Sequence, residues 1–229
     1  MVGPSILLLA LLDGLNLCAL TLLTLFISLM FLYNVRRRMV VALGFAYILG
    51  VYASYFGTGL GIALFAVSLP AVPHFLSRVG AGLMIFFGAA NVANHFMPGT
   101  IPTMVPNSLG KRAVGYMRSM SKGTSFPAVI FVGTLVGLHN FPCACTGGIY
   151  MTFLGLVSGT PLFIEYLAAY NLVFVIPLVS ILLLCSSKAV TLRLRKWRQD
   201  SEEKVRLTIG SLMLVAGVAI LALATSGLV

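Results

Sequence analysis

Charged residues are scarce in this sequence. Only 9% of its 229 residues are Asp, Glu, Lys or Arg, whereas a soluble domain contains roughly 25%. Hydrophobic residues make up 59% of the chain, and its mean hydropathy is +1.05. This composition excludes an ordinary soluble domain and leaves no room for a soluble catalytic one. The apolar runs are continuous rather than alternating, which predicts membrane-spanning helices rather than the strands of a barrel.

Acidic residues are scarcer still, with five against 15 basic residues and a net charge of +10. Such a charge can indicate nucleic-acid binding, but its distribution argues against that function here. Nearly all Lys and Arg residues lie in short connections between apolar runs, where they report membrane orientation. We therefore expect a lipid bilayer, and no nucleic acid, as a partner of this chain.

The lack of basic residues near the N-terminus and the small number of cysteines further restrict the class of protein. No basic residue precedes the first apolar run, so we interpret the N-terminus as a retained first helix rather than a cleaved signal peptide. Four cysteines are too few for a disulfide scaffold. Cys18, Cys143 and Cys145 lie deep in apolar runs, which indicates chemistry more than covalent stapling.

Six apolar runs are long enough to cross a membrane as helices, since roughly 20 residues are needed for each crossing. They cover about 5–33, 40–69, 73–97, 125–157, 161–187 and 205–228. The sequence therefore predicts an all-α membrane protein with six transmembrane helices in a single domain, residues 1–229.

The basic residues predict the orientation of these helices. The first, third and fifth connections hold 14 of the 15 Lys and Arg residues, and only Arg78 belongs to the other side. The positive-inside rule places these connections in the cytoplasm, including the long loop 98–124. Both termini are then expected outside the cytoplasm.

Short sequence matches relate the two halves of the chain. The matched pairs are NLCA at 16–19 with FPCA at 141–144, AYIL at 46–49 with AYNL at 169–172, and GLMIFFG at 82–88 with SLMLVAG at 211–217. Their order and nearly constant offset indicate two three-helix repeats, about 1–97 and 125–229. Because each half has three spans, the second enters from the opposite side, which makes the repeat inverted. Such architectures place the working site at mid-membrane, between interrupted helices.

The stretch Leu138–Tyr150, LHNFPCACTGGIY, interrupts the fourth predicted span with polar and helix-breaking residues. Pro142 lacks an N–H and clashes with the preceding turn, so we expect a kink or break at mid-membrane. Cys143 then lies near the N-terminus of a second half-helix, where free N–H groups favour a thiolate. Residues with supporting roles in this interruption are Asn140, Gly147 and Gly148.

The first predicted span contains a similar stretch, DGLNLCAL at 13–20. Gly14 and Asn16 can interrupt the helix before Cys18, and the Asn16 amide can satisfy freed backbone groups. We interpret Cys18 and Cys143 as one redox pair that exchanges with dithiols on either side, with no metal or organic cofactor. Asp13, the only acid in this span, is either a polar partner of the broken helix or a proton-linked residue.

Other interpretations of these residues stay open. A lone buried cysteine is usually a small hydrophobic residue, which is our interpretation of Cys185. Cys145 is a resolving thiol, a metal ligand or a packing residue. The main alternative function is a small-solute or soft-metal-ion transporter, similar in design to LysE-type exporters, in which His139, Cys143 and Cys145 bind the ion.

Taken together, these features resemble the CcdA family, the six-helix relatives of the membrane domain of DsbD. The resemblance covers the whole chain: six spans, and one key cysteine in each of spans one and four. Pro142-Cys143, followed by Gly147-Gly148, matches the family motif in the fourth span. In the first span, Leu17 stands where the family has a proline.

The resemblance implies a thiol-disulfide oxidoreductase of the prokaryotic inner membrane. Family members take reducing equivalents from cytoplasmic thioredoxin and pass them to extracytoplasmic thioredoxin-like proteins, often in support of cytochrome c maturation. Cys18 and Cys143 would be the redox pair of this chain, and Pro142 would position the second of them.

Overall fold

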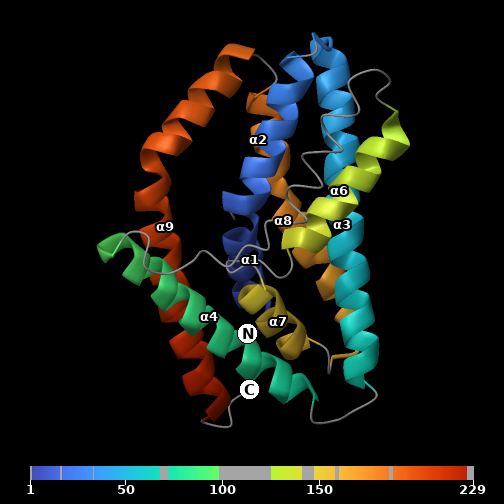
Figure 1. The fold of residues 1–229 in the computed structure, drawn as a ribbon. Helices are drawn as coiled ribbons and strands as arrows, with labels where there is room; N and C mark the ends of the chain where they lie inside the picture. Colours follow the sequence, from blue (N-terminus) through green and yellow to red (C-terminus); the bar gives the residue numbers. More distant parts are fainter. Residues whose placement is uncertain are drawn as a thin grey trace.

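The fold is described by a computed structural model that covers residues 2–15, 17–32, 34–67, 72–97, 125–140, 147–157, 160–185 and 188–225. All regular secondary structure in these ranges is helical, which confirms the predicted all-α class (Figure 1). The helices are α1 (Val2–Gly14), α2 (Leu17–Leu32), α3 (Arg37–Val67), α4 (Val72–Phe96), α6 (Phe126–Asn140), α7 (Gly147–Val157), α8 (Phe163–Leu184) and α9 (Lys188–Thr225).

Three stretches of helix in the described part of the chain are long and apolar enough to cross a membrane. They are Arg37–Ile62, Phe75–Phe96 and Phe163–Leu184, within α3, α4 and α8. These helices indicate a membrane protein, and they match three of the six predicted spans. The other three predicted spans contain shorter apolar helices, Leu22–Phe31, Phe126–Leu138, Gly147–Val157 and Leu207–Ala222. A total of six spans therefore stays a prediction.

The first and fourth predicted spans each contain two helices in place of one. In the first, α1 ends at Gly14 and α2 begins at Leu17. In the fourth, α6 ends at Asn140 and α7 begins at Gly147. The half-helices are too short to cross the hydrocarbon alone, which explains why the first and fourth apolar runs contain no long span. Residues 141–146, with Pro142, Cys143 and Cys145, lie outside the described residues.

The basic stretch 188–204, expected as a connection, is helical and continues into the last apolar run as α9. With 38 residues, α9 is about 57 Å long at 1.5 Å per residue. It runs along one side of the bundle, drawn from orange to red in Figure 1. The side chains of Arg193, Lys196 and Lys204 on its basic half are exposed.

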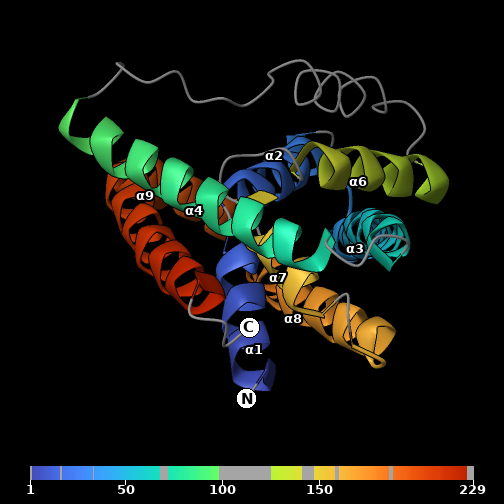
Figure 2. The ribbon, with the colours of Figure 1, turned by 90° about the horizontal axis from the view of Figure 1, so that it is seen from below.

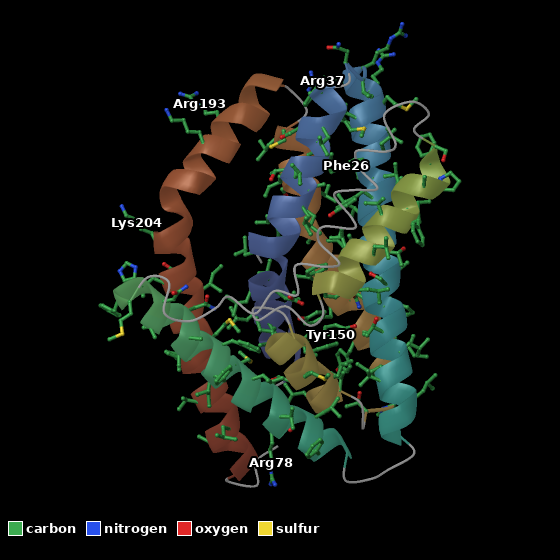
Figure 3. All side chains as sticks on the ribbon, in the orientation of Figure 1. Phe26, Arg37, Arg78, Tyr150, Arg193 and Lys204 are labelled. Carbon is green, nitrogen blue, oxygen red and sulfur yellow. The ribbon has the colours of Figure 1, made fainter. Side chains whose placement is uncertain are left out.

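Basic residues lie at both ends of the bundle, as Figure 3 shows. Arg37 and Arg193, from the first and fifth predicted connections, lie toward the same end, and Arg78 lies at the opposite end. Lys204, also from the fifth connection, lies between them along α9. This separation agrees with the two groups of basic residues in the sequence.

The outer surface is apolar and the interior contains polar groups. Phe75 is 64% exposed and Val215 is 71% exposed, and exposed large hydrophobic residues occur on every helix except α2 and α7 among the described side chains. The buried polar residues are Asp13, Thr24, Ser54, Ser77, Thr152 and Asn171. A surface of this kind is suited to contact with lipid.

Glycines allow the helix backbones to approach closely. The most extensive packing is between α4 and α9, followed by α3 with α6 and α4 with α7. Figure 2 shows α4 crossing α9 and α6 lying beside α3. Between α4 and α7, a Cβ atom on Gly148 would lie 2.8 Å from the Met84 nitrogen. Small residues at such crossings are typical of membrane helix packing.

Two of these close approaches are related by the spacing of the predicted repeat. A Cβ atom on Gly14 of α1 would lie 2.6 Å from the Phe174 carbonyl oxygen and 3.0 Å from Pro177 Cγ. A Cβ atom on Gly137 of α6 would collide with Ser54 Oγ, and would lie 3.1 Å from the Val51 carbonyl oxygen. Each member of the second half follows its counterpart by 123 residues: 14 and 137, 51 and 174, 54 and 177.

The contact between α4 and α9 shows the same relation at an offset of 129 residues. A Cβ atom on Gly88 would lie 2.8 Å from the Gly210 carbonyl oxygen. A Cβ atom on Gly217 would lie 3.0 Å from the Ala81 carbonyl oxygen. Positions 81 and 88 become 210 and 217 in the second half, so this crossing is made by the same pair of positions twice.

Alanine substitutions at two glycines of α4 distinguish the effect of close helix packing on stability from the effect of helix propensity. Gly88 meets backbone atoms of α9, whereas nothing lies within 4 Å of a Cβ atom on Gly82. Alanine favours a helix over glycine by about 1 kcal/mol, so we expect Gly82→Ala to preserve or raise the thermal unfolding midpoint in detergent. Gly88→Ala should lower it, because overpacking costs about 1–3 kcal/mol. Equal midpoints for the two variants would contradict the close contact.

Candidate functional site

A carboxyl group is buried where the first predicted span is interrupted. Asp13 is the second-last residue of α1, and its side chain is 0% exposed. The hydroxyl of Tyr170, on α8, donates a hydrogen bond of 2.8 Å to Asp13 Oδ2. The next residue, Asn171, is also buried, and its Nδ2 donates to the Leu167 carbonyl oxygen over 2.8 Å.

A second hydroxyl is buried where the fourth predicted span resumes. Tyr150 is the fourth residue of α7, and Figure 3 shows it inside the bundle. Its hydroxyl donates a hydrogen bond of 2.6 Å to the Tyr55 carbonyl oxygen in α3. Gly59 leaves the space for it, since a Cβ atom there would collide with the Tyr150 hydroxyl. Of the three glycines at 57, 59 and 61, only Gly59 makes such a contact.

These residues form one continuous group, which we call the central polar cluster: Asp13, Tyr55, Tyr150, Tyr170 and Asn171. The ring centroid of Tyr150 lies 5.5 Å from that of Tyr170 and 5.4 Å from that of Tyr55. Asp13 joins the group through its hydrogen bond from Tyr170, and Asn171 follows Tyr170 on α8.

Apolar rings enclose the central polar cluster. Phe153 stacks on Tyr170 with centroids 4.0 Å apart, and Phe174 stacks on Tyr55 at 4.4 Å. All four rings are buried. Aromatic pairs in these geometries contribute about 0.5–1.5 kcal/mol beyond their buried area, so the cluster is held by packing as well as by its hydrogen bonds.

The two interrupted spans pack against each other around this cluster. α1 contacts α7 and α2 contacts α6, while α8 packs along α1 and α3 packs along α6. The C-terminal end of α1 and the first turn of α7 thus meet in the centre of the bundle. These ends border the sequence stretches that contain Cys18 and Cys143.

The predicted site residues are only partly within the described structure. Cys18 is the second residue of α2, Gly14 ends α1 and Asn140 ends α6. Gly147 and Gly148 begin α7. The remaining predicted site residues, Asn16, Pro142 and Cys143, lie outside the described residues, as do the side chains of Cys18 and Asn140.

The other candidate ligands and thiols are placed as follows. His139 lies in the last turn of α6, and Cys145 lies outside the described residues, so the alternative metal site is not tested. Among the described residues, no group of three His, Cys, Asp or Glu side chains could hold a metal ion. Cys185 is fully buried in the apolar core, as expected for a packing residue.

The tyrosines of the cluster were not predicted as site residues, although the sequence holds two signals for them. Tyr170 belongs to the repeated tetrapeptide AYNL, and its counterpart Tyr47 is also buried, at 1% exposure. Tyr150 ends the stretch LHNFPCACTGGIY. Most buried hydroxyls are hydrogen-bonded, so a tyrosine at either place indicates a polar contact inside the bundle.

Comparison of this chain with known protein families, with curated proteins and with solved structures gave no match.

Loss of the hydroxyl at Tyr170 should destabilise the protein, because it removes the hydrogen bond to a buried carboxyl group. We expect Tyr170→Phe to lower the free energy of unfolding by about 1–3 kcal/mol. Tyr166→Phe, one turn earlier on α8, is the matched control and should change it by less than about 0.5 kcal/mol. Denaturant unfolding in detergent measures both values. A loss no larger for Tyr170→Phe than for the control would contradict the role of this hydrogen bond.

Proposed function

We propose that this chain is a transmembrane electron carrier that works by thiol–disulfide exchange through a Cys18–Cys143 pair. The observation that carries the proposal is the packing of the two interrupted spans. α1 contacts α7 and α2 contacts α6. Asp13 near the end of α1 and Tyr150 in the first turn of α7 both contact Tyr170 in the bundle centre. A lipid-spanning helix has no structural need for such interruptions, because each exposes backbone groups that need new partners.

The proposed architecture is six spans in an inverted repeat of two three-helix halves. It is supported by the paired glycine contacts at constant offsets, Gly14 with Gly137 and Gly88 with Gly217. The repeat relates α1 and α2 to α6 and α7, α3 to α8, and α4 to α9. The packing of α1 on α8 then corresponds to that of α6 on α3, and the packing of α2 on α9 to that of α7 on α4.

This architecture suits exchange on both sides of a membrane. In an inverted repeat the working site is exposed alternately to each side through movement of the two halves. The opposite placement of Arg37 and Arg193 relative to Arg78 supports a shared end for the first and fifth connections, which the positive-inside rule makes cytoplasmic. Both termini would then lie outside the cytoplasm of a prokaryotic cell.

The chemistry needs no cofactor. A cytoplasmic thioredoxin dithiol reduces the Cys18–Cys143 disulfide through a mixed disulfide, and a second exchange passes both electrons to an extracytoplasmic thioredoxin-like protein. Cys18 lies in the first turn of α2, where the helix dipole stabilises negative charge. The resemblance to the CcdA family makes cytochrome c maturation the process that this flow would support.

Thiol alkylation followed by mass measurement tests the proposal. The purified wild-type protein should contain one internal disulfide that reduced thioredoxin removes. Cys18→Ser and Cys143→Ser should each abolish it, and Cys143→Ser should leave a mixed disulfide trapped on Cys18. Cys185→Ser is the matched control, and it should retain the internal disulfide because Cys185 is a packing residue.

Full electron transfer by Cys143→Ser would overturn the proposal. So would a wild-type protein with no internal disulfide and a stoichiometric bound metal ion, which would favour the transporter that uses His139, Cys143 and Cys145. Metal analysis of the same preparations separates the two functions.

A further inference from the structure

Asp13 is a buried acid that the exchange described above does not use. It is one of only five acidic residues in the chain, and it is 0% exposed in the bundle centre. An ionisable group in the membrane interior is costly, so its presence suggests a functional role. Thiol–disulfide exchange has a matching requirement, because each thiolate that leaves a disulfide must take up a proton to become a thiol.

The position of Asp13 fits this requirement. It lies one residue before the end of α1, and Cys18 lies in the first turn of the helix that follows. Asp13 and Cys18 therefore lie on either side of the same interruption in the chain. The hydrogen bond from Tyr170 holds Asp13 Oδ2 at 2.8 Å, and stacking on Phe153 fixes the Tyr170 ring in turn.

The groups that face Asp13 from neighbouring helices are hydroxyls and an amide. The titratable ones are Tyr170 from α8 and Tyr150 from α7, with Tyr55 of α3 behind them. Neither α1, α7 nor α8 contains a Lys, Arg or His residue. Glu165, the one other acid on these helices, is exposed near the start of α8. The neighbouring helices thus bring hydroxyl and amide groups close to Asp13. Such groups can hydrogen-bond both to a carboxylate and to a carboxylic acid.

We propose that Asp13 is the proton donor and acceptor for Cys18 during disulfide exchange, and that Tyr170 positions its carboxyl group. This inference rests on the proposed function and assigns the proton-transfer group of the same site.

In the reduction half-reaction, a thioredoxin thiolate attacks Cys143 sulfur and breaks the Cys18–Cys143 bond. The leaving Cys18 thiolate takes the proton of the Asp13 carboxylic acid. The second thioredoxin thiol loses its proton to water and attacks the mixed disulfide, and the released Cys143 thiolate takes a proton from water. Thioredoxin is oxidised by two electrons, and the protein is left with two thiols and an Asp13 carboxylate.

In the oxidation half-reaction, the Asp13 carboxylate takes back the proton of the Cys18 thiol. The resulting Cys18 thiolate attacks the acceptor disulfide. Cys143 loses its proton to water, attacks the mixed disulfide and restores the Cys18–Cys143 bond. The acceptor leaves as a dithiol after taking up two electrons and two protons, and Asp13 is again a carboxylic acid.

Asp13→Asn tests this role, because the amide keeps an oxygen that accepts from Tyr170 but carries no exchangeable acid proton. The rates to measure are reduction of the oxidised protein by reduced thioredoxin and oxidation of the reduced protein by oxidised thioredoxin, each over a range of pH. We expect Asp13→Asn to slow both by about 10²-fold, the usual contribution of a positioned acid or base. Glu165→Gln is the control acid and should retain wild-type rates.

The pH profile distinguishes proton transfer from a structural role. In Asp13→Asn, water must supply and remove the Cys18 proton. The variant-to-wild-type rate ratio should therefore fall with pH for reduction and rise with pH for oxidation. Taking the ratio cancels the titration of thioredoxin itself. Tyr170→Phe should slow both half-reactions less than Asp13→Asn does. For Tyr170→Phe, the variant-to-wild-type rate ratios of reduction and oxidation should not change with pH in opposite directions.

The infrared difference spectrum between oxidised and reduced wild-type protein gives a test that needs no variant. A carbonyl band of a protonated carboxyl group should be present in the oxidised state and lost on reduction. Its absence would overturn the inference, even if Asp13→Asn failed to fold. Wild-type rates and unchanged pH profiles in Asp13→Asn would also overturn it, and would leave the proposed function intact provided that the wild-type disulfide forms. A wild-type protein without that disulfide would overturn both.

Discussion

Hydrogen bonding of the backbone in hydrocarbon is the constraint on which this structure depends. An interrupted helix leaves N–H and C=O groups that lipid cannot satisfy, so an interruption is tolerated only where other protein surrounds it. Here the ends of α1 and α7 are placed against α8 and α3, and the hydroxyls of Tyr150 and Tyr170 bind the Tyr55 carbonyl oxygen within α3 and the Asp13 side chain. The long helices α3, α4 and α8 each continue without a break between their ends.

Close approach of backbones follows from the same constraint. Hydroxyl groups make hydrogen bonds across helices only where the helix axes lie near one another, and glycine provides that distance in several places. Gly59 makes room for the Tyr150 hydroxyl, and Gly14 lets the end of α1 meet the backbone of α8. These glycines thus allow both the close packing of the helices and the hydrogen bonds between them.

Much of the fold could be predicted from the sequence, because apolar run length and the placement of Lys and Arg respond to the membrane alone. The interruption of the first span was also predictable from Gly14 and Asn16, and α1 and α2 are separate helices although no proline precedes Cys18. The helical state of 188–204 was not predicted, because its charged residues resemble those of a connection while their backbone propensity favours a helix.

The candidate site was less predictable than the fold. Asp13 and the cysteine stretches stand out in sequence because polar residues are rare in such a chain. The tyrosines do not, since a tyrosine in an apolar run is equally compatible with the membrane interface. Only the packing of α1, α7 and α8 shows that Tyr150 and Tyr170 face the same carboxyl group.

The equivalent positions 54 and 177 make the two halves of the bundle mechanically unequal. On α3, Ser54 keeps its backbone N–H, and its Oγ donates to the Val51 carbonyl oxygen over 2.8 Å. On α8, Pro177 lacks the N–H that would complete the corresponding turn, which weakens the helix there. Gly14 packs against Pro177, and Gly137 packs against Ser54. Bending is therefore easier at the turn of α8 that packs against Gly14 than at the turn of α3 that packs against Gly137.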